Sequence, residues 1–243
     1  EAARNTRLSK TSDFGSGCSA DGNLIIEASI FDKLVAQLQK EGGHLASPAE
    51  KELLRKAMWD DERHRTSSTV AIAPQQLAKI AGFEIAADRK FIMVHGDGIG
   101  KQHHFSGEKL TTLLALYKYQ GFDQALEMMR AIYEVGGKGH SCGIYSFDED
   151  HIHRLGLAAP VSRIMVRQPQ SKANAGAFNN GMPMTSSLGC GTWGGNIISE
   201  NVNLKHYLNT TWVSVPIKED KPSDEELFGP FYDPELEAET ITS

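Results

Sequence analysis

The sequence contains few cysteines, and their number is odd. The three residues, Cys18, Cys142 and Cys190, are widely spaced in a chain of 243 residues, so they indicate no disulfide framework and favour a reducing compartment such as the cytoplasm. Because no run of about 18 apolar residues is present, we expect no transmembrane helix and no membrane partner. The polar, charged N-terminus also lacks the apolar segment of a secretory signal peptide.

A cluster of basic residues is also absent. The formal net charge is −6, and 25 Lys and Arg residues are spread among 31 Asp and Glu residues. This balance argues against nucleic acid or an anionic membrane as a partner. Hydrophobic residues make up 40% and charged residues 23% of the chain, which is typical of a globular protein that buries a core in one large or two small domains.

Motifs for metals and nucleotides are missing as well. The histidines and cysteines show neither HExxH nor CxxC spacing, so we expect no metal site and interpret His103-His104 as part of a polar loop. The glycine-rich segment from Leu188 to Asn196 (LGCGTWGGN) does not follow the GxGxxG pattern and lacks the lysine of a phosphate-binding loop. We therefore do not expect it to bind nucleotide phosphates.

The chain does contain an alternation of strand and helix patterns. Short apolar runs predict strands, and apolar residues at helical spacing predict the helices between them. Together they predict an α/β fold with a mostly parallel, Rossmann-like open sheet that helices cover on both faces. The expected strands are 23–27, 90–95, 113–119, 141–147 and 163–167, and the expected helices are 1–10, 29–40, 49–59, 74–80, 122–135, 148–157 and a short one at 204–208.

The segment from Lys172 to Asn201 interrupts this alternation. It is rich in glycine but also holds Phe178, Met184 and Trp193, which favours an ordered, functional loop. The stretch from Thr210 to Val215 is rich in β-forming residues. The acidic, proline-containing stretch that follows is expected to be extended or partly disordered.

Cys18 is the leading candidate for chemistry. It lies in the segment from Phe14 to Ala20 (FGSGCSA), where small neighbours leave its sulfur accessible. Backbone N–H groups of a helical turn there would favour the thiolate and could hold an oxyanion. The local context alone leaves open whether this thiol is reactive or buried and inert.

The remaining candidates have simpler interpretations beside the functional one. Cys142 begins a predicted strand two residues after His140, and residues at this spacing share a face without necessarily bonding, so a packed structural cysteine is preferred. Cys190 is interpreted as a small packing residue or one that faces a pocket. Glu108 directly precedes a predicted strand, where active-site groups of α/β folds collect, although a solvated Glu-Lys pair is the simpler interpretation.

Four segments together resemble the aldehyde dehydrogenase superfamily and, within it, the coenzyme-A-acylating branch. They are SDFGSGCSADGN around Cys18, GEKLTTLLALYKY around Glu108, GGKGHSCGIYS around His140, and SLGCGTWGGNIISENVNLKHYLN from Ser187 to Asn209. They follow the order and spacing of that branch, which includes the aldehyde dehydrogenase half of aldehyde-alcohol dehydrogenases. The pattern is also similar to that of acylating sulfoacetaldehyde dehydrogenases.

The resemblance implies roles for the matching residues. Cys18 would be the catalytic thiol that attacks the aldehyde carbon, and Glu108 would bind the ribose of the nicotinamide. His140 would lie at the pocket for substrate and coenzyme A, with no assigned role of its own. The glycine-rich loop would line the same pocket through Gly189, Cys190, Gly191 and Asn196.

The activity that the resemblance implies is oxidation of a small aldehyde with NAD or NADP, with sulfoacetaldehyde as one candidate. Cys18 would form a thiohemiacetal and, after hydride transfer, a thioester. The acyl group would then pass to coenzyme A as co-substrate. A homo-oligomer is expected, since C-terminal arms of the family pair between subunits and the stretch from Thr210 to Val215 would be such a strand.

The resemblance also predicts the domain organisation. Residues 1–215 would form the catalytic domain with its oligomerisation strand, and residues 216–243 an acidic extended tail. Because the chain begins at Glu1 in what resembles mid-domain sequence, the N-terminal cofactor-binding domain is expected to be absent and the chain alone to be inactive towards aldehydes. Two alternatives stay open: a hydrolytic aldehyde dehydrogenase that releases a free acid, and a non-catalytic oligomerisation scaffold of the same fold.

Overall fold

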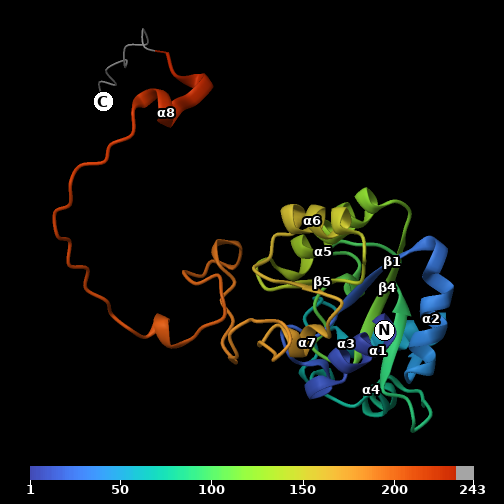
Figure 1. The fold of residues 1–243 in the computed structure, drawn as a ribbon. Helices are drawn as coiled ribbons and strands as arrows, with labels where there is room; N and C mark the ends of the chain where they lie inside the picture. The colour runs from blue at the N-terminus through green and yellow to red at the C-terminus, as the bar shows by residue number, and fades with distance from the viewer. Residues whose placement is uncertain (234–243) are drawn as a thin grey trace. The chain divides into compact units, whose positions relative to one another are not determined.

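The computed structural model of the chain describes residues 1–233 (Figure 1). Contacts within the chain divide it into two units, Glu1–Tyr207 and Leu208–Ser243. The first unit holds the sheet and all the candidate site residues. The helices and strands of this unit are α1 (Ala2–Lys10), β1 (Asn23–Glu27), α2 (Phe31–Lys40), β2 (Gly43–Leu45), α3 (Pro48–Met58), α4 (Pro74–Ala81), β3 (Phe91–His95), β4 (Leu113–Tyr119), α5 (Phe122–Gly136), β5 (Cys142–Ile144), α6 (Glu149–Ala158), β6 (Ile164–Val166) and α7 (Gln170–Ala173).

The central sheet has four parallel strands in the order β1-β4-β3-β2. Asn23 of β1 is in register with Ala115 of β4, and Ile92 of β3 with Leu113 of β4. Strands β5 and β6 form a separate parallel pair. The predicted α/β fold with a mostly parallel sheet is therefore confirmed.

Helices cover both faces of the four-stranded sheet because β3 and β4 are apolar on both sides. On one face, Phe91 and Met93 of β3 pack in a buried cluster with residues of α1 and α2. On the other face, Ile92 and Val94 pack with residues of α3 and α4. Complete burial of a large aliphatic side chain contributes roughly 1.5–3 kcal/mol, so these two clusters hold the sheet between its helices. A third cluster joins α5 and α6 to β1, β5 and β6.

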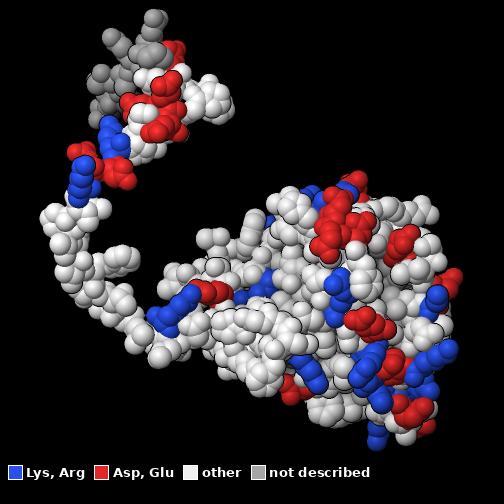
Figure 2. All heavy atoms as spheres, viewed as in Figure 1, with Lys and Arg blue, Asp and Glu red and all other residues white. Residues whose placement is uncertain are grey.

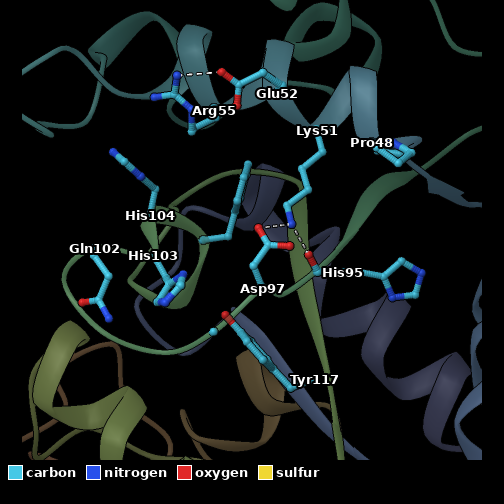
Figure 3. Close-up of a pocket in the computed structure, with 13 residues that line it drawn as sticks. Pro48, Lys51, Glu52, Arg55, His95, Asp97, Gln102, His103, His104 and Tyr117 are labelled. Atoms are coloured by element: carbon cyan, nitrogen blue, oxygen red, sulfur yellow. Dashed lines mark hydrogen bonds and ion pairs between the residues drawn. The ribbon is translucent and has the colours of Figure 1, made fainter.

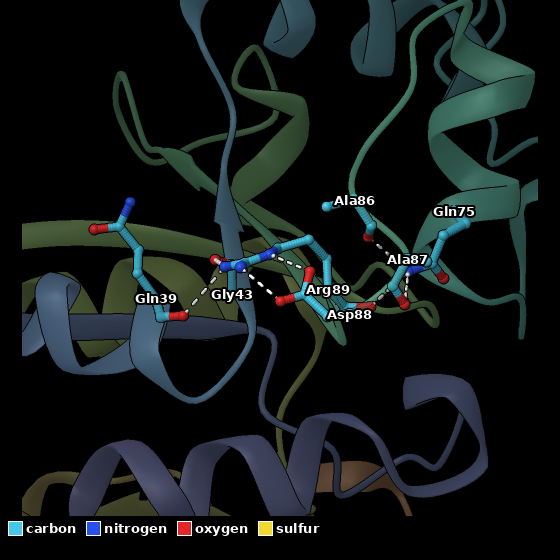
Figure 4. A network of polar contacts seen from close by, with 7 residues as sticks. All are labelled: Gln39, Gly43, Gln75, Ala86, Ala87, Asp88 and Arg89. Atoms are coloured by element: carbon cyan, nitrogen blue, oxygen red, sulfur yellow. Dashed lines mark hydrogen bonds and ion pairs between the residues drawn. The ribbon is translucent and has the colours of Figure 1, made fainter.

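Local signals in the sequence explain several element boundaries. Ser47 caps α3 in a reciprocal capping box with Glu50, and the Asp148 side chain accepts bonds from the first N–H groups of α6. The segment that leads into β3 is fixed by Arg89, which donates to the carbonyls of Gln39 and Gly43 (Figure 4). These bonds tie the start of β3 to the end of α2 and to β2.

The structure corrects the sequence-based boundaries in several places. The strand expected at 141–147 spans only Cys142–Ile144, because the chain turns into the N-cap of α6 at Asp148. Strand β2 was not expected, because Gly42 and Gly43 look like a helix stop; yet Gly43 starts a strand that pairs with β3. The expected helix at 204–208 is a 3₁₀ turn over Leu204–His206. The short helix α7 falls just before the glycine-rich segment and was also not expected.

The segment after α7 is ordered by buried asparagines. The Asn201 amide donates to the carbonyls of Asn174 and Pro183, and Asn174 and Asn201 are both almost completely buried. The backbone of Leu188 also bridges to Asn201. This long loop therefore has a defined conformation that holds its glycine-rich part in place.

The second unit contains only short structure in its described part, residues 208–233. The stretch from Thr210 to Val215, expected to be β-rich, forms no strand within this single chain, because a lone strand has no partner for its backbone groups. The part expected to be extended includes a short helix, α8 (Asp224–Phe228), capped by Ser223. Residues 234–243 of the expected tail lie outside the described residues.

The surface carries charges of both signs. On the face shown in Figure 2, Lys and Arg are interspersed with Asp and Glu and form no basic patch. Among the described residues, no helix is long and apolar enough to cross a membrane.

Candidate active site

Cys18 lies in the turn between α1 and β1, with an exposed thiol. The turn is tight: Asp13 and Phe14 have positive φ, and so has Gly15 with φ +71°. A side chain on Gly15 would meet the Thr111 carbonyl oxygen at 2.5 Å. Only glycine permits this approach, so the Cys18 turn packs directly against the segment that enters β4.

His140 brings a base to this thiol from the loop between α5 and β5. Its Nε2 lies 3.0 Å from Cys18 Sγ, across 122 residues of sequence. Its Nδ1 lies 2.8 Å from Ser141 Oγ, so one ring nitrogen faces the thiol while the other is held. The partner of His140 is therefore Cys18 rather than Cys142 of its own loop.

The His140 loop is fixed by its backbone. Gly139 exchanges hydrogen bonds with Pro160 and Ser162, and the Tyr133 hydroxyl donates to the Ser141 carbonyl at 2.7 Å. Gly139 has φ +108°, and a side chain there would meet the Cys190 carbonyl oxygen at 2.7 Å. Glycine is therefore required at this position, and it brings the His140 loop against the glycine-rich loop.

The glycine-rich loop folds tightly on itself. The Asn196 side chain accepts from the Cys190 N–H at 2.9 Å, and the Gly191 N–H donates to the Ile198 carbonyl at 2.9 Å. A side chain on Gly189 would meet the Ile198 carbonyl oxygen at 2.1 Å. The four loop residues named from the sequence thus form one compact turn beside His140.

Arg163 connects this loop to the thiol and the imidazole. It is almost completely buried, and its Nη2 donates to the Gly189 carbonyl at 2.7 Å. Its Nε and Nη1 have no partner among the described residues. Burial lowers the pKa of the Arg163 guanidinium, and Cys190 and Cys18 oppose this shift.

The electrostatic environment keeps His140 neutral. Burial of the half-buried imidazole and the nearby Arg163 cation both lower its pKa from the ordinary value of 6.5. At pH 7 the ring is therefore a proton acceptor for a thiol at hydrogen-bonding distance. Cys142, in contrast, is removed from this chemistry, because burial raises the pKa of its thiol to about 12.

Glu108 lies at the same edge of the sheet, in the segment that enters β4. Its side chain is exposed, while the next residue is anchored: the buried Lys109 ammonium donates to Asn23 Oδ1 at 3.0 Å and to the carbonyls of Phe105 and Gly107. Asn23 in turn donates to the Ser106 carbonyl at 3.0 Å. The backbone of Glu108 is thus fixed against the strand that follows Cys18, with its carboxylate facing solvent.

A buried pair of charges lies beneath the Cys18 turn. Burial raises the pKa of Asp21 to about 6, although the Ser9 hydroxyl and Lys10 oppose this shift. Burial lowers the pKa of Lys10 to about 8, opposed by Asp21 and Glu108. Sequence reasoning missed Lys10 and Asp21. Its simpler interpretation of Glu108 and Lys109 as a solvated pair is wrong for Lys109, which is buried because its ammonium finds three acceptors inside the protein.

The structure brings Cys18 to His140, and the His140 loop to the glycine-rich loop, whereas Glu108 shares only the edge of the sheet with them. Cys18 precedes β1 and Glu108 precedes β4, and both strands are parallel neighbours. The site lies at the amino ends of the strands, whereas ligands of open α/β sheets usually bind at the carboxyl ends.

The chain resembles acylating aldehyde dehydrogenases in sequence. It is 37% identical over 235 residues to a sulfoacetaldehyde dehydrogenase of Acholeplasma sp., covering 95% of this chain and 48% of that protein. It is 34% identical to the acetylating succinate-semialdehyde dehydrogenase of Clostridium kluyveri, covering 94% of this chain and 51% of that protein. The chain thus spans about half the length of the curated relatives it matches. No family model matches it.

The comparison of structures agrees. The acetylating aldehyde dehydrogenase of Geobacillus thermoglucosidasius matches with a TM-score of 0.84 and 32% identity, over 91% of this chain and 49% of that chain. In sequence and fold, the chain is therefore similar to the acylating branch of the aldehyde dehydrogenase family.

Proposed function

We propose that this chain provides the thioester-forming site of a coenzyme-A-acylating aldehyde dehydrogenase. The observation that carries the proposal is the 3.0 Å contact between Cys18 Sγ and His140 Nε2. It joins an exposed nucleophile to a neutral base, the arrangement by which thiols are activated for covalent catalysis.

In the first step, Cys18 adds to the aldehyde. The S–C bond forms, the carbonyl electron pair moves onto oxygen, and the thiol proton passes to His140 Nε2. The developing oxyanion needs fixed positive partners. The Cys18 backbone N–H and the buried Arg163 cation, with two unpartnered nitrogens, are the groups of this chain that would supply them.

Oxidation to the thioester needs a dinucleotide, and Glu108 fits one end of it. NAD or NADP supplies the hydride acceptor when bound. The exposed Glu108 carboxylate on an anchored backbone is suited to accept hydrogen bonds from two ribose hydroxyls. In residues 1–233 we identify no glycine-rich strand-to-helix turn for the pyrophosphate, so Glu108 would hold only the nicotinamide end. An engineered glycolyl-CoA reductase of the same fold, 21% identical, has been solved with bound NADP+.

In the last step, the thiol of coenzyme A attacks the thioester carbon. Once His140 has released the proton of the first step to solvent, it accepts the proton of coenzyme A. The new S–C bond forms, the bond to Cys18 breaks, and Cys18 leaves as a thiolate that His140 can reprotonate. The compact loop of Gly189 to Asn196 would line the entry of this thiol beside His140. A propionaldehyde dehydrogenase of Rhodopseudomonas palustris with the same fold, 22% identical, has been solved with bound CoA and an acylated cysteine.

The named relatives also indicate the substrate and assembly that we propose. Two of them act, by name, on sulfoacetaldehyde and succinate semialdehyde, so we propose a small aldehyde, with sulfoacetaldehyde as the first candidate. We further propose a homo-oligomer, because Trp212, Val213 and Val215 are exposed, as expected of an arm that pairs with another subunit. The three free thiols suit a reducing compartment such as the cytoplasm.

The acyl-exchange half-reaction tests this proposal without any dinucleotide. The chain is incubated with S-acetyl-N-acetylcysteamine, a small thioester, and intact mass and peptide mapping locate the acetyl group. We expect one acetyl group on Cys18, none in Cys18→Ser, and an unchanged result in the matched control Cys142→Ser.

The fate of the acetyl group then distinguishes the alternatives. Transfer from Cys18 to added coenzyme A faster than loss to water supports the acylating enzyme. Faster loss to water would favour a hydrolytic enzyme. No acetylation of Cys18 would favour the scaffold.

A further inference from the structure

A cavity of about 360 Å³ lies at the carboxyl edge of the sheet, at the other end of the strands from Cys18. It forms where β2 and β3 end, and the first turns of α3 and the segment after β3 build its walls (Figure 3). Its volume is in the range of small-molecule sites, roughly 300–1,000 Å³. None of its lining residues takes part in the proposed aldehyde chemistry, so this cavity has no role yet.

Tyr117 of β4 directs an unused polar group into this cavity. The side chain is only 4% exposed, and its hydroxyl has no hydrogen-bond partner among the described residues. Figure 3 shows this hydroxyl turned toward the side of the cavity that holds Asp97 and His103. An unsatisfied buried hydroxyl costs about 1–3 kcal/mol, so its position indicates a ligand with an acceptor atom.

The carboxylates of the cavity are already neutralised. Lys51 pairs with Asp97 and donates to the His95 carbonyl at 2.6 Å. Arg55 pairs with Glu52 through two bonds of 2.7 and 2.8 Å. The groups that remain for a ligand are therefore mainly donors.

Cations lie near His104, whereas the charged neighbour of the Tyr117 hydroxyl is Asp97, which Lys51 pairs. Burial lowers the pKa of His104, and the cations Arg55 and Arg63 lower it further, against only Glu52 in the opposite direction. The cavity also holds His95, His103 and the Gln102 amide. Within residues 1–233, no group of three His, Cys, Asp or Glu side chains is placed to hold a metal ion.

Two glycines after β3 make room for the cavity walls. A side chain on Gly96 would meet the Tyr117 ring at 2.1 Å, and one on Gly98 would meet the His103 ring at 2.5 Å. Both rings therefore pack directly on the backbone of this turn. The sequence HGDG (residues 95–98) has no role in the aldehyde chemistry. Its two glycines allow the rings of Tyr117 and His103 to approach each other.

We propose that this cavity binds a small organic anion that carries a carboxylate, sulfonate or phosphate group. The anionic oxygens would accept from the Tyr117 hydroxyl, the imidazoles of His103 and His104, and the free nitrogen of Arg55. The site is independent of Cys18, because it lies at the opposite edge of the sheet. An occupant would therefore bind together with the aldehyde rather than in its place.

Titration of the chain with inorganic phosphate, sulfate and acetate tests the proposal. The imidazole NMR signals of His103 and His104 are followed at pH 7 and constant ionic strength, with chloride as the balancing anion. We expect saturable shifts with a dissociation constant in the millimolar range for at least one of the three anions. Tyr117→Phe should weaken binding at least fivefold, whereas the matched control Tyr119→Phe, on the same strand and outside the cavity, should not.

Each other outcome overturns the proposal. Shifts that never saturate, or that chloride reproduces, would show that the cavity takes no specific anion. Equal anion affinities of Tyr117→Phe and Tyr119→Phe would show that the buried Tyr117 hydroxyl does not bind the anion. If Tyr117→Phe does not fold, Arg55→Gln gives the same test. Loss of binding in Arg163→Met, with the melting temperature retained, would place the anion in the Cys18 site instead.

Discussion

Replacement of His140 by asparagine is the most direct test of the site geometry. Asparagine has a similar size and keeps a polar side chain, but it cannot accept the Cys18 proton. An ordinary thiol with a pKa near 8.5 is roughly 3% ionised at pH 7, so a base that removes the proton during attack can accelerate the reaction by at most about 30-fold. We therefore expect His140→Asn to slow acetyl exchange on Cys18 by about 10- to 30-fold at pH 7.

The dependence of this effect on pH follows from the same geometry. Near pH 9 most ordinary thiols ionise without help, so the difference between wild type and variant should shrink to about twofold. In the wild type, His140 should still act as a base below pH 6.5, because burial and Arg163 lower the pKa of the imidazole and keep it unprotonated there. The variant should lack this acidic limb of the profile.

The assay is the mass-spectrometric rate of Cys18 acetylation between pH 5.5 and 9, with His153→Asn as the control. His153 is an exposed histidine on α6, so its replacement should leave the profile unchanged. A loss in His140→Asn that is as large at pH 9 as at pH 7 would refute the base role. His140 would then only shape the pocket.

Three further predictions concern the rest of the site. Brief iodoacetamide treatment should label Cys18 at least about 100 times faster than Cys142, since burial raises the pKa of the latter thiol to about 12; mass mapping that finds Cys142 first would contradict this. Lys109→Met should lower the free energy of unfolding in urea by about 2–4 kcal/mol, because three buried acceptors lose their donor, while the exposed control Lys33→Met should change it by less than about 0.5 kcal/mol. Because the folded state keeps the proton of Asp21 up to about pH 6, stability should fall by up to about 3 kcal/mol as pH rises from about 4 to 6; Asp21→Asn should lack this slope, and an identical slope would assign it to other groups.

The fold was predictable where the sequence pattern is long enough to be unambiguous. Strands β1 and β4 begin and end where their apolar runs do, and α5 follows its helical spacing almost residue for residue. Strand β2 was not predictable because it has three residues and begins at Gly43. A side chain there would come within 3 Å of Met93 and Phe91, so glycine marks a close contact with β3 rather than only a helix stop.

One part of the candidate site could be predicted from the local sequence, whereas another part depends on tertiary contacts. The accessibility of Cys18 is a local property and follows from its small neighbours. The contact with His140 is tertiary: it requires Gly139 to approach Cys190 and the β5-β6 pair to place Arg163 beside the loop. No spacing in the sequence encodes that arrangement, which is why the resemblance left His140 without a role.

The edge of the sheet at which the site lies follows from strand direction alone. Cys18 and Glu108 each come shortly before a strand, and β1 and β4 are parallel neighbours with Asn23 opposite Ala115. Parallel strands have all their amino ends at one edge, so residues that precede adjacent strands must meet there. The rule that ligands bind at carboxyl ends describes crevices formed by loops that leave strands, whereas both of these segments enter strands. The carboxyl edge is therefore free of the aldehyde chemistry, and in this chain it holds the cavity around Tyr117.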